Sequence, residues 1–191
     1  MRRCAIAVVA ALALAGCGTT DSPGAAGRDR PNDASPPPTS QTRTDPPAKR
    51  TAPQRQAAQQ LRFTATTLDG DSFDGRSLAG RPAVLWFWAP WCPVCNREAP
   101  GIAAAAAEYG DRVTFVGVAA QDQLPAMREF AAKHRLDSFV HLNDERADVW
   151  ARFGVTYQPA FAFISADGDV DVVKEPLPES ELDAKLEALA G

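Results

Sequence analysis

The sequence predicts an α/β domain in which a central mixed β-sheet has helices on both faces. Two runs of almost entirely apolar residues, at 83–88 and 113–119, are typical of strands buried on both faces of a helix-covered sheet. Strand-like and helix-like segments alternate as far as Pro159, after which a hairpin and a closing helix follow. This change of order predicts a mixed sheet rather than a purely parallel one.

The other elements follow from local patterns. Residues 63–73 alternate around Asp69-Gly70, which predicts an N-terminal β-hairpin that extends the sheet. Pro93 opens a helix that runs through Ala107, at a position where its missing N–H costs nothing. The remaining predicted elements are a helix from Asp122 and Pro125 to about His134, a short edge-like strand at 139–142, a helix capped by Asn143 or Asp144 and ending near Phe153, two strands at 160–165 and 170–173, and a helix at 179–189.

Composition divides the chain into a tether and a folded domain. All 9 Phe, 4 Trp and 2 Tyr occur from Phe63 onward, so a packed core is expected only in residues 61–191. Half of the 16 prolines occur up to and including Pro53, among Ser, Thr, Gln and charged residues. This composition predicts that residues 17–60 form a disordered, Pro-rich tether.

Charge and hydropathy exclude two classes of protein. Residues 61–191 hold 12 Lys and Arg against 20 Asp and Glu, a net charge of -8, which disfavours binding to nucleic acid. No apolar run approaches the roughly 18 residues that a membrane-spanning helix requires. We therefore expect neither a nucleic-acid-binding protein nor an integral membrane protein.

The N-terminus has the pattern of an export signal. A basic segment at residues 1–3 precedes an apolar run of ten residues, 5–14. Residues 14–17, Leu-Ala-Gly-Cys, resemble a bacterial lipobox, in which the Cys thiol is acylated and becomes the N-terminus after cleavage. The resemblance implies that residues 1–16 are a lipoprotein signal peptide and that Cys17 anchors the domain to the extracytoplasmic face of the cell membrane. An ordinary signal peptide with an incidental Cys is the alternative.

Cys92 and Cys95 are the only cysteines of the predicted domain, and their spacing is C-x-x-C. Cys92 stands where a buried strand gives way to a helix. The unpaired N–H groups and the dipole of a helix N-terminus favour a thiolate, so we expect Cys92 to be the exposed nucleophile. Cys95, one turn further into the helix, is then the shielded resolving thiol.

Two structural alternatives for this pair are weaker. An inert disulfide between residues only three apart would constrain the unfolded chain little and would stabilise weakly. A zinc site would need two more ligands, and His134 and His141, seven residues apart, lie outside the usual finger spacing. We therefore expect no metal and no cofactor beyond the cysteines.

Residues 91–95, Trp-Cys-Pro-Val-Cys, followed by Glu98 and Pro100, resemble the active-site segment of thioredoxin-fold proteins. The chain is most similar to the exported TlpA, ResA and DsbE-like branch, and its lipobox and tether resemble those of actinobacterial DsbE- and DsbF-type lipoproteins. A second marker is the segment 153–159, which precedes a strand-like run. In this family the proline at the place of Pro159 is cis and faces the Cys pair, so the resemblance implies a thioredoxin-like fold with Pro159 in the catalytic site.

The resemblance also implies roles for neighbouring residues. Glu98 matches a glutamate that helps set thiol acidity in the cytochrome-maturation reductases of the branch. Trp91, Pro93 and Gln158 are expected to bind substrate, with the Gln158 backbone pairing to an extended chain. Trp86 departs from thioredoxins proper, which have a buried proton-accepting Asp there, so proton transfer from the resolving thiol is expected to use water or Glu98.

Together these features predict an exported thiol-disulfide oxidoreductase acting on exported proteins, as a disulfide-forming oxidase rather than a reductase in cytochrome c maturation. Pro93-Val94, unlike the Gly-Pro of reducing thioredoxins, favours the oxidase, and Glu98 favours the reductase. Two other classes of protein were compared with this prediction. A peroxiredoxin would have Thr at the place of Ala89, three residues before Cys92, so that enzyme class is disfavoured. A tethered metal-binding or adaptor module without thiol exchange activity is the alternative outside the enzymes. The expected partners are exported protein thiols or disulfides and a membrane redox protein that recycles the Cys pair, with the chain acting as a monomer.

Overall fold

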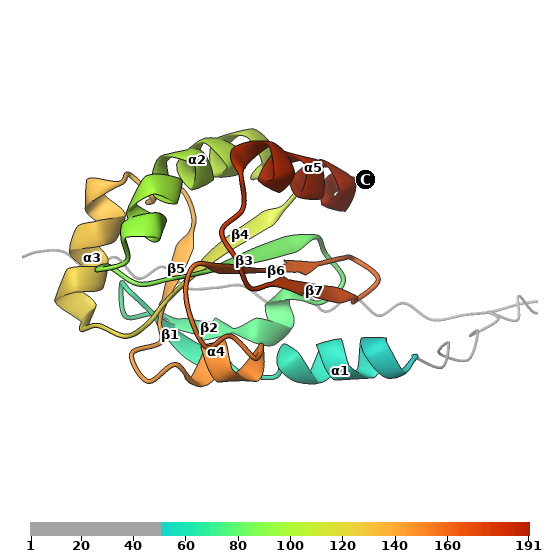
Figure 1. Ribbon diagram of the computed structural model, residues 1–191. Coiled ribbons are helices and arrows are strands. Elements are labelled where there is room, and N and C mark those ends of the chain that lie inside the picture. Colours follow the sequence, from blue (N-terminus) through green and yellow to red (C-terminus); the bar gives the residue numbers. More distant parts are fainter. Residues whose placement is uncertain (1–50) are drawn as a thin grey trace, which may run out of the picture. The chain divides into compact units, whose positions relative to one another are not determined.

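The computed structural model describes residues 51–191. Seven strands form one mixed sheet in the order β2-β1-β5-β4-β3-β6-β7 (Figure 1). The two apolar runs become β3 (Ala83–Trp88) and β4 (Thr114–Ala119), which pair in parallel at the middle of the sheet. The other strands are β1 (Thr64–Thr67), β2 (Ser72–Asp74), β5 (Val140–Asn143), β6 (Ala160–Ile164) and β7 (Val170–Val173).

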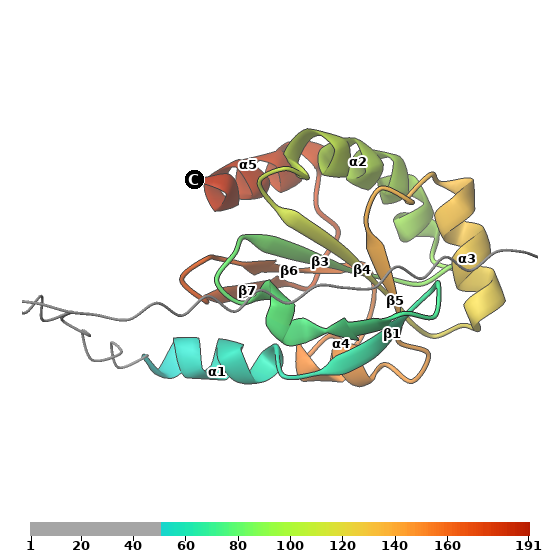
Figure 2. The same ribbon diagram turned by 180° about the vertical axis from the view of Figure 1, so that it is seen from behind.

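Helices cover both faces of this sheet, as predicted. The helices α2 (Pro93–Tyr109), α3 (Leu124–Lys133) and α5 (Glu179–Ala190) lie on one face, and α1 (Ala52–Gln60) and α4 (Asp148–Arg152) lie on the other (Figures 1 and 2). Side chains of β3 alternate between the two buried apolar clusters, since Trp86 and Trp88 enter the cluster under α2 while Leu85 and Phe87 enter the one under α4. This double burial accounts for the unbroken apolar pattern of the strand.

The predicted hairpin is formed by β1 and β2, and a 3-10 helix at Gly75–Leu78 follows it. Gly70 in its turn has φ 98°, a left-handed conformation that favours glycine. On its other side β1 pairs antiparallel with β5, with Thr66 opposite Asn143. The prediction that β5 is edge-like was therefore wrong: its short length is typical of an edge strand, but the hairpin covers the side that would otherwise be open.

The boundary between tether and domain also differs from the prediction. Residues 52–60, assigned to the disordered tether, form α1, which begins with a capping box between Thr51 and Gln54. The helix is held by long-range contacts: Gln54 Nε2 donates to the Asp167 carbonyl at 3.3 Å, and Arg152 donates to the Gln59 carbonyl at 3.2 Å. The predicted signal peptide, Cys17 and the tether up to residue 50 lie outside the described residues. No helix within residues 51–191 is long and apolar enough to cross a membrane.

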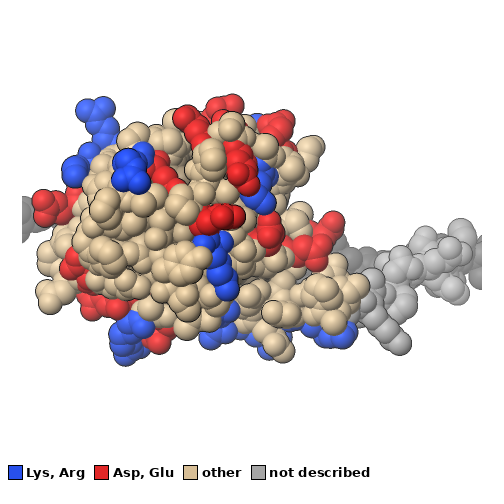
Figure 3. Space-filling model, in the orientation of Figure 1, with Lys and Arg blue, Asp and Glu red and all other residues tan. Residues whose placement is uncertain are grey.

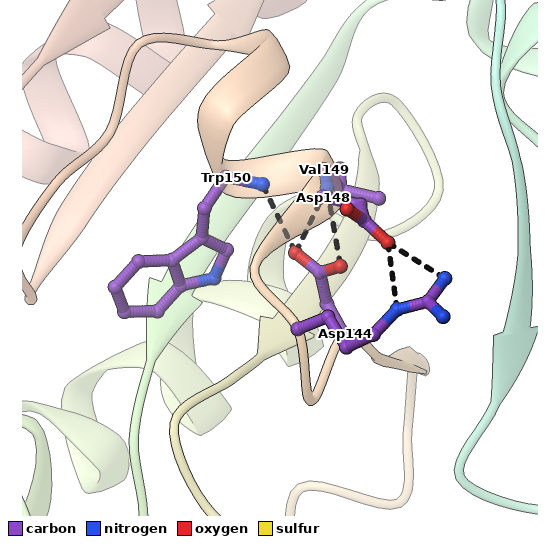
Figure 4. Close-up of polar contacts among 5 residues, drawn as sticks. Asp144, Asp148, Val149 and Trp150 are labelled. Carbon is purple, nitrogen blue, oxygen red and sulfur yellow. Dashed lines mark hydrogen bonds and ion pairs between the residues drawn. The ribbon is translucent and has the colours of Figure 1, made fainter.

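The N-cap of α4 is Ala147, so the prediction of Asn143 or Asp144 at that position was wrong, although Asp144 does bind the first turn of the helix. The buried carboxylate of Asp144 accepts hydrogen bonds from the backbone N–H groups of Val149 and Trp150 at 3.0 Å (Figure 4). Burial raises the pKa of Asp144, while the hydrogen bonds from these N–H groups lower it. The intervening chain is tight, because Ala147 adopts φ 58° immediately before the helix. The carboxylate thereby fixes the start of α4, which supports the face of the sheet opposite α2.

Candidate active site

The Cys pair is placed by the junction of β3 and α2. The strand ends at Trp88 in the middle of the sheet, and the chain turns so that the Cys92 N–H donates to the Ala89 carbonyl at 3.1 Å. Cys92 is the N-cap of α2, and Pro93 is its first residue. This is the strand-turn-helix arrangement predicted from the sequence, and it sets Cys92 against the unpaired N–H groups of the helix.

The two thiols interact directly. The Cys95 backbone N–H donates a hydrogen bond to the Cys92 Sγ at 3.1 Å, and both cysteines are free. Burial raises the pKa of the Cys95 thiol far above its usual range, and a side-chain hydrogen bond between the two thiols reinforces the shift. Cys95 is thus a thiol that keeps its proton, as expected of a shielded resolving group.

Cys92 itself is more covered than expected. The sequence predicts an exposed nucleophile, but Cys92 is only 3% exposed, against 0% for Cys95. The reason is local: as N-cap, the Cys92 side chain turns back over the first helical turn to accept the Cys95 N–H instead of projecting into solvent.

Glu98 lies one helical turn after Cys95, and both of its carboxyl oxygens are buried without a hydrogen-bond partner within 3.5 Å. Burial raises the pKa of Glu98 to about 7, opposed by the nearby Trp86 indole, the Leu177 backbone N–H and the Arg97 charge. The Glu98 charge in turn contributes to the raised pKa of Cys95. A carboxyl group that titrates near neutral pH therefore lies beside the buried thiol.

A groove of about 630 Å³ opens beside Glu98. It lies between α2 and the chain leading into α5, and its walls include Val94, Phe161 and Leu177. Val94, one of the two residues enclosed by the cysteines, and Glu98 both line this groove, whereas neither cysteine does.

The Gln158-Pro159 peptide bond is cis, as the family resemblance implies. Pro159 is buried and immediately precedes β6, whose first residue, Ala160, lies opposite Phe87 near the end of β3. Pro159 and the turn that carries Cys92 are therefore at the same edge of the sheet. Gln158 is half-buried and lies outside the strand ladder.

Trp91 is 55% exposed, and its indole N–H donates to the Gln121 carbonyl at 3.0 Å. Tyr157, two residues before Pro159, is 54% exposed. Pro93 is also exposed. Figure 3 shows basic and acidic side chains where Figure 1 places the start of α2, and a mainly uncharged area below them, toward the chain leading into β6. Two large aromatic side chains, Trp91 and Tyr157, are thus exposed close in sequence to Cys92 and Pro159.

No group of three or more His, Cys, Asp or Glu side chains within residues 51–191 is arranged to hold a metal ion. The two histidines weighed as zinc ligands are bonded elsewhere: His134 Nε2 to the Asn96 side chain at 3.0 Å, and His141 Nε2 to the Leu136 carbonyl at 2.9 Å. Burial lowers the pKa of His141 to about 4, so its ring is neutral at physiological pH.

Residues 49–187 match the model of the Redoxin family. The chain belongs to the Redoxin family. It is 48% identical over 136 residues to the soluble secreted antigen MPT53 of Mycobacterium tuberculosis, covering 70% of this chain and 78% of that protein. The fold is thioredoxin-like, in agreement with the prediction: the structure of Mycobacterium tuberculosis dsbF is 54% identical, covers 68% of this chain and 96% of that one, and has a TM-score of 0.67.

A further structure is that of a secreted Mycobacterium tuberculosis disulfide oxidoreductase homologous to Escherichia coli DsbE. It is 49% identical, covers 68% of this chain and 98% of that one, and has a TM-score of 0.65. This Redoxin-family chain is thus a thiol-disulfide oxidoreductase of the DsbE/DsbF type that carries the close pair Cys92 and Cys95.

Proposed function

We propose that this Redoxin-family protein forms disulfide bonds in exported proteins. A substrate thiolate attacks the Cys92 sulfur of the oxidised pair, the Cys92–Cys95 bond breaks, and Cys95 leaves as a thiolate that takes up a proton. A second substrate thiolate then attacks the substrate sulfur of the mixed disulfide and releases Cys92. The substrate loses two electrons, and the Cys pair gains them as a dithiol.

The observation that carries this direction is the hydrogen bond from the Cys95 N–H to the Cys92 Sγ at the N-terminus of α2. The bond and the helix dipole stabilise negative charge on the Cys92 sulfur, which exists only after the disulfide is reduced. Stabilising the reduced form makes the disulfide a stronger oxidant.

Glu98 supports a second candidate, a thiol reductase that serves cytochrome c maturation. A reductase starts from the dithiol, and its Cys95 must lose a proton before it can resolve the mixed disulfide. Since burial raises the pKa of Cys95, a nearby base is needed, and the buried Glu98 carboxyl, with a pKa of about 7, is the base that we propose for this candidate.

Equilibration with glutathione buffers distinguishes the two candidates. An oxidase should have a reduction potential well above the roughly -270 mV of thioredoxin and should oxidise a reduced, unfolded protein. A potential at or below that value, without such oxidation, would assign the protein to the reductases. A Cys pair that exchanges with neither glutathione nor protein thiols would instead support an adaptor or metal-binding module.

The proposed substrate is an extended segment of an exported protein. Its backbone would pair beside Gln158, and the exposed Trp91 and Pro93 would contact its side chains. A membrane redox protein would recycle the reduced pair, and the protein would act as a monomer. Cross-linking through the trapped mixed disulfide of a Cys95→Ser variant in cells, followed by mass spectrometry, identifies both kinds of partner.

We further propose that Cys17 is acylated and holds the domain at the extracytoplasmic face of the membrane, after removal of residues 1–16. The support is the Leu-Ala-Gly-Cys sequence at residues 14–17. The relative MPT53 is named a soluble secreted antigen, so the two proteins would differ in anchoring. Stable anchoring needs more than one acyl chain. Intact-mass measurement of membrane-extracted protein should show lipidated Cys17; an unmodified residue, or protein only in the soluble fraction, would refute the anchor.

A further inference from the structure

Asn96 links the turn that carries Cys92 to the end of α3. Its side-chain amide Nδ2 donates to the carbonyls of Pro90 at 3.2 Å and Cys92 at 3.0 Å. Its Oδ1 accepts from Lys133 Nζ at 3.1 Å and faces His134 Nε2 at 3.0 Å. One half-buried amide therefore joins two segments separated by 37 residues.

The orientation of this amide is determined by its partners. Lys133 can only donate, so the atom facing it must be the carbonyl oxygen Oδ1. The two backbone carbonyls can only accept, so the atom facing them must be Nδ2. The same reasoning fixes the His134 ring, whose Nε2 must carry the proton shared with Asn96.

This arrangement directs the Asn96 dipole toward the Cys pair. The positive NH₂ end lies on the Cys92 carbonyl, and the negative end lies against the Lys133 ammonium group. A cation held in this way polarises the amide and strengthens the hydrogen bonds at its other end. The Cys92 carbonyl also accepts a hydrogen bond from the Asn96 backbone N–H at 3.1 Å. Asn96 therefore donates two hydrogen bonds to the carbonyl of Cys92, one from its side chain and one from its backbone.

We propose that Asn96 is a positioning residue that fixes the Pro90–Cys92 turn and couples the positive charge of Lys133 to the Cys92 sulfur, thereby favouring the reduced pair. The inference rests on the proposed function only in assuming that the pair is redox-active, in either direction. Without Asn96, the carbonyls of Pro90 and Cys92 lose their side-chain hydrogen-bond donor. A negative charge on the Cys92 sulfur is then no longer stabilised through the amide by the Lys133 ammonium group. The dithiol should then be less stable relative to the disulfide.

Three variants separate the contacts of the Asn96 side chain. Asn96→Ala removes all of them. Asn96→Asp keeps an acceptor for Lys133 but cannot donate to the turn carbonyls, and it adds a negative charge near Cys92. Lys133→Met removes only the cation from an exposed position of α3. Lys174→Met is the matched control, because it makes the same change in charge at an exposed residue after β7.

Two measurements are made on each folded variant. The first is the equilibrium of the Cys pair with glutathione, and the second is the pH midpoint of Cys92 alkylation. For Asn96→Ala we expect the equilibrium constant to shift toward the disulfide by about threefold to tenfold, the equivalent of one net hydrogen bond. The alkylation midpoint should move to higher pH. Asn96→Asp should shift both further, Lys133→Met should shift both less in the same direction, and Lys174→Met should leave both unchanged.

A purely structural role gives a different pattern. It would lower the melting temperature of Asn96→Ala while leaving the glutathione equilibrium and the alkylation midpoint at wild-type values, and that result would overturn the proposal. If the Asn96 variants do not fold, Lys133→Met still decides, since identical behaviour of Lys133→Met and Lys174→Met also overturns it. A wild-type protein without thiol exchange would refute the proposed function instead, so the two failures are distinguishable.

Discussion

The backbone N–H of Cys95 donates a hydrogen bond to the Cys92 Sγ, so Cys95 stabilises negative charge on the Cys92 sulfur while burial keeps the Cys95 thiol protonated. One turn of helix therefore makes two chemically similar side chains unequal. The exposed fractions of the two side chains, 3% for Cys92 and 0% for Cys95, are nearly equal, so these fractions alone do not indicate the asymmetry.

This asymmetry predicts the order in which the thiols react. In the reduced domain at mildly acidic pH, iodoacetamide should modify Cys92 before Cys95, because the Cys95 N–H donates to the Cys92 sulfur while burial raises the pKa of the Cys95 thiol. Peptide mapping after brief labelling measures the ratio. A Cys95→Ser variant should accumulate the mixed disulfide, whereas Cys92→Ser should form none; preferential labelling of Cys95 would reverse the assigned roles.

Glu98 predicts how stability depends on pH. Its pKa of about 7 in the folded protein lies above its ordinary value of 4.5, so between these values the folded state binds more protons than the unfolded state. This contribution to stability is full below about pH 4.5 and is lost as the pH rises through about 7. Glu98→Gln should remove it. The variant should melt at a higher temperature than wild type at pH 8 and at a similar temperature at pH 4; equal melting temperatures at both values would contradict the assignment.

The same substitution tests the proton transfer to and from Cys95. If the Glu98 carboxyl exchanges this proton, Glu98→Gln should slow resolution of the mixed disulfide by about a hundredfold, the lower range for general acid–base catalysis. Rapid-mixing kinetics measure this step, and its pH dependence near 7 should disappear in the variant. Glu108→Gln, on an exposed position of the same helix, is the control for a changed charge on α2. An unchanged rate would leave water as the proton acceptor.

The sequence predicted the elements whose signals are local and missed those that depend on distant partners. The strand 83–88 and the helix N-terminus at Cys92 follow from an apolar run and from Pro93, and the structure contains both. The helix α1 has no aromatic residue and only Ala57 buried, so its composition is that of a tether. The capping box of Thr51 and Gln54 is a local signal for this helix that the tether-like composition outweighed, and the contact of Gln54 with Asp167, across 113 residues, is one that local sequence does not indicate.

The candidate site shows the same division. The C-x-x-C spacing at the start of a helix identified Cys92 and Cys95, and the family resemblance identified Glu98. Asn96 was not singled out, since its partners Lys133 and His134 are 37 and 38 residues away. The coverage of Cys92 was also missed, because it depends on a side-chain rotation that spacing does not determine.

Trp91 should affect protein substrates more than small ones. Its side chain is more than half exposed and its indole N–H donates to Gln121, so Trp91→Ala should lower the free energy of unfolding by less than about 1.5 kcal/mol. Loss of an exposed aromatic contact should slow oxidation of a reduced protein by about tenfold, as at interface hot spots. Exchange with glutathione should stay the same. Val140→Ala, an exposed apolar residue at the start of β5, is the control; equal losses for protein and glutathione would remove Trp91 from the substrate surface.

Two glycines offer a paired test of the packing under the site. An added Cβ at Gly117, in β4, would overlap the His141 ring and approach the Trp88 indole nitrogen within 2.9 Å, whereas one at Gly101, in α2, would meet no atom within 4 Å. Gly117→Ala must therefore displace buried rings beside the last residue of β3 and should lower the free energy of unfolding by about 1–3 kcal/mol. Gly101→Ala gains helix propensity and should raise it by about 0.5–1 kcal/mol. Urea unfolding of the reduced proteins measures both changes. Trp88 leads directly into the turn that carries Cys92, so Gly117→Ala should also slow thiol exchange. If Gly117→Ala were as stable and as active as Gly101→Ala, the His141 ring would move aside at no cost in free energy.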